Sequence, residues 1–120
     1  INIKGCKIIS FMPYYELGNY YRLADIGVWP NQESTSQLDS LACGNSVIIN
    51  SKTGVPERAL NSGYLYEYGS AADLANKILL LNKYETRKTF SSNSIKKSKK
   101  YFWSSIANDY LEDYKKITKK

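Results

Sequence analysis

The sequence predicts an α/β fold built on a doubly wound parallel sheet. Short apolar runs alternate with amphipathic stretches from the first residues to about Asn82. The runs are apolar at consecutive positions, which is typical of strands that are covered on both faces. Parallel strands need right-handed helical crossovers, so the expected order is β-α-β-α-β-α-β-α. Such sheets bind ligands beyond the carboxyl ends of their strands.

Four apolar runs are the strand candidates. Pro13 follows the first run and Pro30 follows the second, and a proline ends a ladder because it has no N–H to donate. The fourth run gives the weakest signal. The candidates are residues 7–11, 26–29, 47–50 and 64–66.

Helical spacing and end signals mark the segments between these strands. Gly44 suits the residue just beyond a helix, and Pro56 suits a first turn. Ser70 with Asp73 three residues later resembles a capping box, with Asp in the usual place of Glu or Gln. The expected helices are residues 14–24, 35–43, 56–60, 70–81, 84–94 and 103–117.

The basic character of the chain lies at its C-terminal end. The formal net charge is +6, with nine basic against eight acidic residues up to Ile95 and eight against three in residues 96–120. We therefore expect residues 96–120 to form a basic helical tail. Its last helix carries an apolar stripe that should pack against the sheet or a neighbouring domain. The stripe consists of Ile106, Tyr110, Tyr114 and Ile117.

Composition excludes several classes of protein. The chain has no histidine and only two cysteines, Cys6 and Cys43. It therefore has no disulfide framework, no ligand set for a zinc site and no histidine-activated nucleophile, and we expect no metal. The sequence has no membrane-spanning stretch or secretory signal, so we expect a soluble, cytoplasmic protein. Because Ile1 stands in place of Met directly before an apolar run, we expect a piece of a longer protein.

Residues 29–44 carry the candidate site. Glu33 lies in the loop between the second strand and the next helix. Ser34 suits the cap of that helix, which would leave the N–H groups of Thr35 and Ser36 open to an anion. Asp39 lies one turn further, on the same side, where a carboxylate can accept hydrogen bonds from a ribose diol. The alternative is that both acids only complement the helix dipole and the serine only caps.

Several short pieces follow one another in a specific order. They are Glu16-Leu17, the run Tyr-Tyr-Arg-Leu-Ala-Asp-Ile-Gly-Val-Trp-Pro at 20–30, Gln-Glu-Ser-Thr-Ser at 32–36, Leu-Asp-Ser-Leu-Ala-Cys-Gly at 38–44, Val-Ile-Ile at 47–49, Gly-Val-Pro-Glu at 54–57 and Phe-Trp-Ser-Ser-Ile-Ala at 102–107. Together, over about residues 8–114, they resemble a retaining GT-B glycosyltransferase of family four (group 1). The resemblance implies the second half of its C-terminal, Rossmann-like donor-binding domain, which closes with C-terminal helices.

The resemblance also implies roles for the candidate residues. That family has two acidic residues in this loop and helix, usually glutamates with seven residues between them. The first lies at the donor sugar and its transfer site, and the second binds the nucleotide ribose. Glu33 would then be catalytic at the donor sugar and Asp39 would bind the ribose. Ser34, Thr35 and Ser36 would contact sugar hydroxyls and diphosphate. Here only five residues separate the acids, the second acid is Asp, and Ser-Thr-Ser replaces the usual Gly-Phe-Gly.

The first strand raises a separate expectation. Phe11 and Met12 correspond to family positions that contact the nucleotide base, and the alternative is that they are core or loop residues. The family's Gly-rich first unit, its basic pair at the diphosphate and its acceptor domain are not among these 120 residues. Residues 7–11 would therefore lack their neighbours in the sheet, so we expect exposed sheet edges and an inactive isolated piece.

The implied function is sugar transfer by a longer protein of the hexosyltransferase type. It would move a sugar from a nucleotide-sugar donor to a sugar or lipid-linked acceptor, which the missing N-terminal domain would hold. Configuration would be retained, and no metal or other cofactor would be needed. Such enzymes often build cell-surface polysaccharide or other glycans, and a basic tail suits peripheral contact with the inner face of the membrane. The alternative for the tail is a solvated face.

Two other classes of function are compatible with the sequence. A sugar-nucleotide epimerase, or a non-catalytic subunit that binds nucleotide sugars, would share the fold. A nucleic-acid-binding module is suggested by the run Lys-Lys-Ser-Lys-Lys-Tyr at 96–101. Basic tails bind polyanions without specificity, so we expect no specific nucleic-acid partner.

Overall fold

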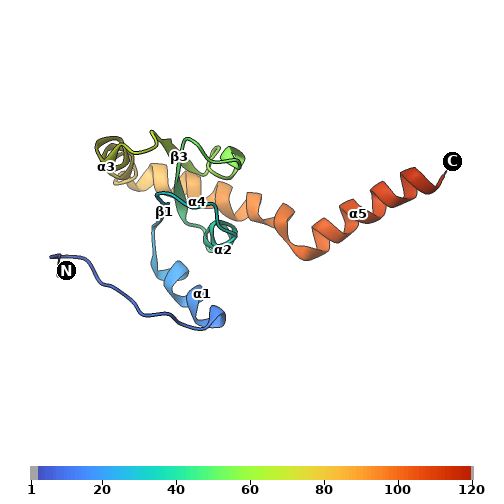
Figure 1. The fold of residues 1–120 in the computed structure, drawn as a ribbon, viewed down its shortest axis with the longest axis horizontal. Coiled ribbons are helices and arrows are strands. Elements are labelled where there is room, and N and C mark those ends of the chain that lie inside the picture. Colours follow the sequence, from blue (N-terminus) through green and yellow to red (C-terminus); the bar gives the residue numbers. More distant parts are fainter. Residues whose placement is uncertain (1–2, 120) are drawn as a thin grey trace.

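The structure is a computed structural model that describes residues 3–119. Three parallel strands lie in the order β1-β2-β3, with helices before, between and after them (Figure 1). The elements are α1 (Tyr14–Leu23), β1 (Ile26–Trp29), α2 (Ser36–Ala42), β2 (Ser46–Asn50), the 3-10 helix η1 (Pro56–Arg58), β3 (Gly63–Tyr66), α3 (Ala71–Leu80), α4 (Tyr84–Ser98), the 3-10 helix η2 (Lys99–Tyr101) and α5 (Trp103–Thr118).

Each face of the sheet buries its own apolar cluster. All five residues of the central strand β2 are buried. Val47 and Ile49 pack on one face with Leu41 of α2. Ile48 packs on the opposite face with Leu81, which follows α3. Because helices cover both faces, the predicted α/β class with a doubly wound parallel sheet is confirmed.

The sheet also depends on one close approach between strands. Val47 of β2 pairs with Gly63 of β3. A Cβ atom at Gly63 would collide with the backbone carbonyl of Val47, so only glycine fits there. The strand β3 can therefore lie against β2 without a bulge at this point.

The end signals of the helices are largely confirmed. Gly44 follows α2 with a φ of 82°, the left-handed conformation that favours glycine after a helix. Ser70 Oγ accepts a hydrogen bond from the Asp73 N–H at 3.1 Å, as predicted for the start of α3. The Asp73 carboxylate does not close a reciprocal box; its Oδ2 accepts from the Glu67 N–H at 2.7 Å.

The strand predicted at residues 7–11 is wrong. This segment is extended coil ahead of α1, with Ile8 85% exposed and Phe11 fully exposed. An apolar run becomes a strand only when a neighbour satisfies its backbone groups, and no strand within residues 3–119 pairs with it. The described sheet therefore has three strands instead of four, and a helix precedes the first one.

The helix predicted to end at residue 94 continues to Ser98. The basic run therefore begins inside α4 rather than in a separate tail. The Lys97 ammonium donates to the backbone carbonyl of Glu57 at 2.6 Å and to that of Leu60, which fastens η1 to α4. Burial lowers the pKa of Lys97, and the nearby Lys100 lowers it further.

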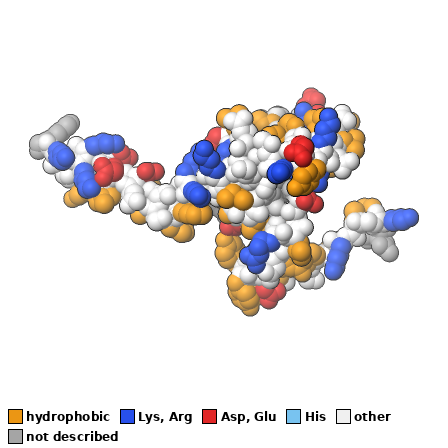
Figure 2. All heavy atoms as spheres, turned by 180° about the vertical axis from the view of Figure 1, so that it is seen from behind, with side chains coloured by type: hydrophobic (Ala, Val, Ile, Leu, Met, Phe, Trp, Pro, Cys, Tyr) orange, Lys and Arg blue, Asp and Glu red, His pale blue; other side chains and the backbone are white. Residues whose placement is uncertain are grey.

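The last helix leaves the body of the protein. In Figure 1, α5 extends away from the sheet, and Figure 2 shows hydrophobic side chains at its surface. Tyr110, Tyr114 and Ile117 of the predicted stripe are 75%, 65% and 72% exposed. The alternative that this stripe packs against the sheet is therefore wrong, because α5 reaches past the sheet's end. Packing against a neighbouring domain stays a prediction. No helix among the described residues has both the length and the apolar character needed to cross a membrane.

Candidate functional site

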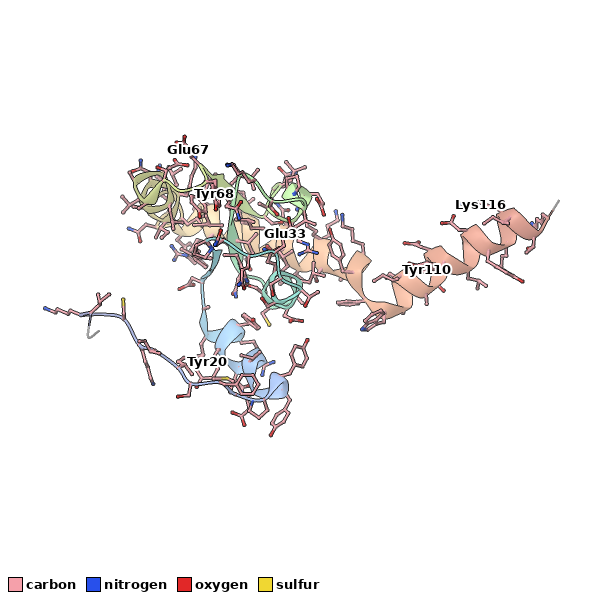
Figure 3. The ribbon with its side chains drawn as sticks, in the orientation of Figure 1. Tyr20, Glu33, Glu67, Tyr68, Tyr110 and Lys116 are labelled. Atoms are coloured by element: carbon pink, nitrogen blue, oxygen red, sulfur yellow. The ribbon has the colours of Figure 1, made fainter. Side chains whose placement is uncertain are left out.

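The candidate site lies where the three strands end. Parallel strands point the same way, so the loops that follow them gather at one edge of the sheet. These loops are residues 30–35 after β1, 51–55 after β2 and 67–70 after β3. Figure 3 labels Glu33, Glu67 and Tyr68, which belong to these loops. We call this edge the carboxyl edge.

Glu33 lies at the carboxyl edge, and the neighbouring loop orients it. Its carboxylate accepts hydrogen bonds from the Gly54 N–H and from the Thr53 hydroxyl, the latter at 3.3 Å. A Cβ atom at Gly54 would lie 3.0 Å from Glu33 Oε1, so a glycine gives the carboxylate its room. The Glu33 side chain is itself exposed. A charged oxygen atom is thus held in a fixed direction but stays open to solvent.

The hydroxyl groups of the helix start form a connected chain. Trp29 Nε1 donates to Ser36 Oγ at 3.0 Å, and Ser34 Oγ lies 2.7 Å from Ser36 Oγ. The Ser36 N–H donates to Ser34 Oγ at 3.2 Å. The expectation that this N–H is open to an anion is therefore wrong, because the serine two residues earlier satisfies it. The helix begins at Ser36 with Thr35 as the cap residue, one residue later than the predicted Ser34 cap.

Arg58 and Gln37 hydrogen-bond to the backbone of this loop. Neither residue was identified from the sequence. Arg58 Nη1 donates to the Ser34 carbonyl at 3.1 Å and to Gln37 Oε1 at 2.8 Å. Gln37 is fully buried, and its Nε2 donates to the Gln32 carbonyl at 3.5 Å. A glutamine at a buried position of a short helix was the one signal in the sequence that could have pointed to them.

Asp39 faces α1 instead of the Glu33 loop. The Tyr14 hydroxyl donates to Asp39 Oδ1 at 2.8 Å. This hydrogen bond, together with the negative charge of the carboxylate, raises the pKa of Tyr14. The two acids therefore have different partners, since Glu33 binds the loop after β2.

A cavity of about 480 Å³ opens beside Asp39. Aromatic side chains from the junction of η2 and α5 line much of it. Its lining residues are Tyr14, Leu38, Asp39, Ala42, Ser98, Tyr101, Phe102, Trp103 and Ser104. One carboxylate among aromatic rings is the kind of surface that binds a sugar or a nucleoside.

The structure does not bring Phe11 and Met12 to the carboxyl edge. Both lie in the coil before α1, where the side chain of Phe11 is fully exposed and that of Met12 is half-buried. Their position follows from the absence of a strand at residues 7–11. Such a strand would have lain in the sheet and ended at the carboxyl edge, next to Phe11 and Met12.

Lys52 is a further charged group at the carboxyl edge that sequence reasoning missed. Its ammonium lies 4.6 Å from the centroid of the Tyr68 ring, a cation–π distance. The Tyr68 N–H donates to Ser51 Oγ at 3.1 Å, which ties the loops after β2 and β3 together. In the part of the chain that the structure describes, no group of three His, Cys, Asp or Glu residues could hold a metal ion.

Comparisons with known proteins agree with this fold. No family model matches the sequence. An uncharacterized glycosyltransferase of Methanocaldococcus jannaschii is 25% identical over 123 residues, which cover 98% of this chain and 35% of that protein. The structure of a sucrose-phosphate synthase from Thermosynechococcus elongatus matches with a TM-score of 0.74 and 24% identity, over 91% of this chain and 29% of that one.

These matches bear on the fold and on how much of each protein the similarity covers. The structural likeness confirms the Rossmann-like α/β architecture of GT-B proteins that the sequence predicted. The chain spans about a third of the length of each of these two proteins.

Proposed function

We propose that this chain is the donor-binding part of a glycosyltransferase that retains the configuration of the sugar it transfers. The observation that carries the proposal is the placement of Glu33, whose carboxylate lies at the carboxyl edge and is oriented by Gly54 and Thr53. Ligands of such sheets bind at this edge. The similarity to a protein described as a glycosyltransferase supports the same class of activity.

In this proposal the donor sugar lies against the loop after β1. Glu33 serves the sugar and its transfer site. The hydroxyls of Ser34 and Ser36, which already hydrogen-bond each other, and the exposed Thr35 contact sugar hydroxyls and diphosphate. Donors that are fixed in advance stabilise the charge that develops on a departing diphosphate. The remaining positive charge comes from basic residues outside this chain.

The nucleotide part of the donor is assigned to Asp39. Its carboxylate borders the aromatic cavity and accepts hydrogen bonds from the ribose diol, beside the Tyr14 hydroxyl. Phe11 and Met12 stay candidates for the base in a protein where residues 7–11 have neighbours in the sheet. The donor is a nucleotide sugar, and no metal or other cofactor takes part.

The cellular setting is also a proposal. A further domain holds a sugar or lipid-linked acceptor, and the hexosyl transfer serves polysaccharide or glycan synthesis in the cytoplasm. Lys96 near the end of α4, and Lys99 and Lys100 just after it, are exposed and suit peripheral contact with anionic lipid at the inner face of the membrane. The isolated chain is inactive because the acceptor cannot bind to it.

A thermal-shift screen of UDP-, GDP- and ADP-sugars with the intact protein tests the proposal. A ligand that binds only the folded state raises its stability, by about 2.7 kcal/mol at 100 times the dissociation constant. We expect one donor class to raise the melting temperature and to be consumed in a transfer assay. Product anomers followed by NMR report whether configuration is retained. No stabilisation by any donor would contradict the proposal.

Variants separate catalysis from binding. Glu33→Gln should lower the transfer rate at least about 100-fold and leave the thermal shift in place, because the lost group acts on the reacting sugar. Asp39→Asn should reduce the shift itself. Glu67→Gln, an exposed acid at the same edge, is the matched control and should change neither. Full activity of the Glu33→Gln protein would favour an epimerase or a non-catalytic binding subunit.

A further inference from the structure

Arg58 occupies an unusual position for a charged side chain. It is half-buried under the loop after β1, and its partners are the carbonyl of Ser34 and the side-chain oxygen of Gln37. None of the ion pairs found among residues 3–119 includes it. Its Nε atom is buried and has no hydrogen-bond partner in the described part of the chain.

The unpartnered Nε atom is unfavourable for stability. A buried N–H group without an acceptor has lost its hydration and gained nothing in return, and a charged group loses more. An apolar side chain of similar length would avoid that loss, but it would leave the buried Gln37 Oε1 and the Ser34 carbonyl without this donor. The loop after β1 therefore depends on the two hydrogen bonds that the guanidinium donates.

The backbone that carries Arg58 is itself held in place by two contacts of Lys97. That backbone belongs to η1, which the Lys97 ammonium ties to α4 through the carbonyls of Glu57 and Leu60. From this base the guanidinium reaches the backbone between Glu33 and the start of α2. On its other side the same loop is held by the contact of Glu33 with Gly54. The segment 32–37 is therefore fixed from two directions.

We propose that Arg58 is a positioning residue for sugar transfer. By holding the Ser34 carbonyl and Gln37, it fixes the loop so that Glu33 and the hydroxyl of Ser34 keep one orientation toward the donor sugar. Arg58 acts through this loop and does not touch the substrate. The inference rests on the proposed function and adds a residue to it.

Arg58→Met in the full-length protein is the main test. Methionine fills the space but makes neither hydrogen bond. We expect the melting temperature to fall modestly, because the buried Gln37 Oε1 loses its donor. At a temperature where the variant stays folded, the KM for the nucleotide sugar should change little and kcat should fall about 10- to 100-fold, which is the effect of a displaced catalytic group. Arg58→Lys should recover part of kcat. Arg22→Met is the matched control, because among residues 3–119 that guanidinium donates only to Asn19, in its own helix.

Amide hydrogen exchange gives a readout that does not depend on activity. In Arg58→Met, the amides of Ser36 and Gln37 should exchange at least about 10-fold faster, while that of Ile48 in the central strand should not change. Equal acceleration of exchange at Ser36, Gln37 and throughout the sheet would show a purely structural role and overturn the proposal. An unchanged kcat would overturn it as well.

The two proposals can fail separately. If the unmodified protein transfers sugar from no nucleotide donor, the proposed function fails, and the positioning role for sugar transfer fails with it. In that case unaltered exchange at Ser36 and Gln37 would also remove Arg58 as the support of the loop. If the unmodified protein is active and Arg58→Met keeps full kcat, only the positioning role is overturned.

Discussion

Tyr14 and Asp39 join α1 to α2, with the phenolic hydroxyl 2.8 Å from Asp39 Oδ1. The helix α1 has no buried residue, so this hydrogen bond is a principal tie between α1 and the rest of the fold. The carboxylate that we assign to a ribose is the same one that holds the helix. Loss of the tyrosine hydroxyl should therefore affect both the docking of α1 and the affinity for the nucleotide.

Tyr14→Phe should make the docking of α1 less dependent on pH. The Asp39 carboxylate raises the pKa of Tyr14 above its ordinary value of 10.0. The contact is therefore fully present below pH 10 and is lost as pH rises through the raised pKa, where two negative charges face each other. Urea midpoints measured across this range should fall above pH 10 in the unmodified protein and fall less in the variant. Tyr15→Phe, 80% exposed, should behave like the unmodified protein.

Gly63→Ala should be among the most damaging small substitutions. The added Cβ atom would collide with the Val47 carbonyl, which cannot move without breaking the β2–β3 ladder. We expect a loss of about 3 kcal/mol in the free energy of unfolding, the upper end of the usual cost of overpacking, measured by urea titration. Gly18→Ala in α1 is the opposite case, because nothing lies closer than 3.7 Å to its added Cβ. It should stabilise that helix by about 0.5–1 kcal/mol.

Lys97→Met should weaken the connection between η1 and α4. The ammonium donates to the carbonyls of Glu57 and Leu60, and methionine leaves both without that donor. The expected loss in the free energy of unfolding is about 1–3 kcal/mol. Lys99→Met, at an exposed position two residues further, should cost less than about 0.5 kcal/mol. Equal effects of the two substitutions would contradict this role of Lys97.

The stability of the sheet should not depend on the aromatic face of α5. Leu41 is fully buried against β2, so Leu41→Ala should cost about 2–5 kcal/mol. Tyr110 is 75% exposed, so Tyr110→Ser should change the free energy of unfolding by less than about 0.5 kcal/mol. Denaturation of both variants of the isolated chain measures the difference. A large loss in Tyr110→Ser would mean that α5 folds back onto the sheet.

Local signals in the sequence predicted most of the fold. Pro30 and the consecutive apolar residues before it give the bounds of β1 without error, and Ser70 gives the start of α3. Residues 7–11 have the same apolar character but form no strand, because strand formation depends on a partner that the run itself does not reveal. The extension of α4 to Ser98 was missed since Lys97 is stabilised by carbonyls far away in the chain.

The candidate site was predictable in part. The position of Glu33 at the carboxyl edge follows from the strand before it and the helix after it. Its contact with Gly54 joins residues 21 positions apart, and that of Arg58 with Ser34 joins residues 24 positions apart. Such pairs depend on how two loops meet after folding, and no local pattern encodes them. The roles of Glu33, Ser34, Thr35, Ser36 and Asp39 stay predictions.

The main-chain partner of Glu33 has a consequence for how this protein could diversify. An amide N–H is present whatever side chains surround it, so substitutions at Lys52 and Val55 would leave the direction of the acid unaltered. Natural drift or a directed-evolution library at those two positions could therefore change which ligand binds, while the Glu33 carboxylate keeps its orientation. Substrate preference and chemistry would evolve as separable traits in this loop.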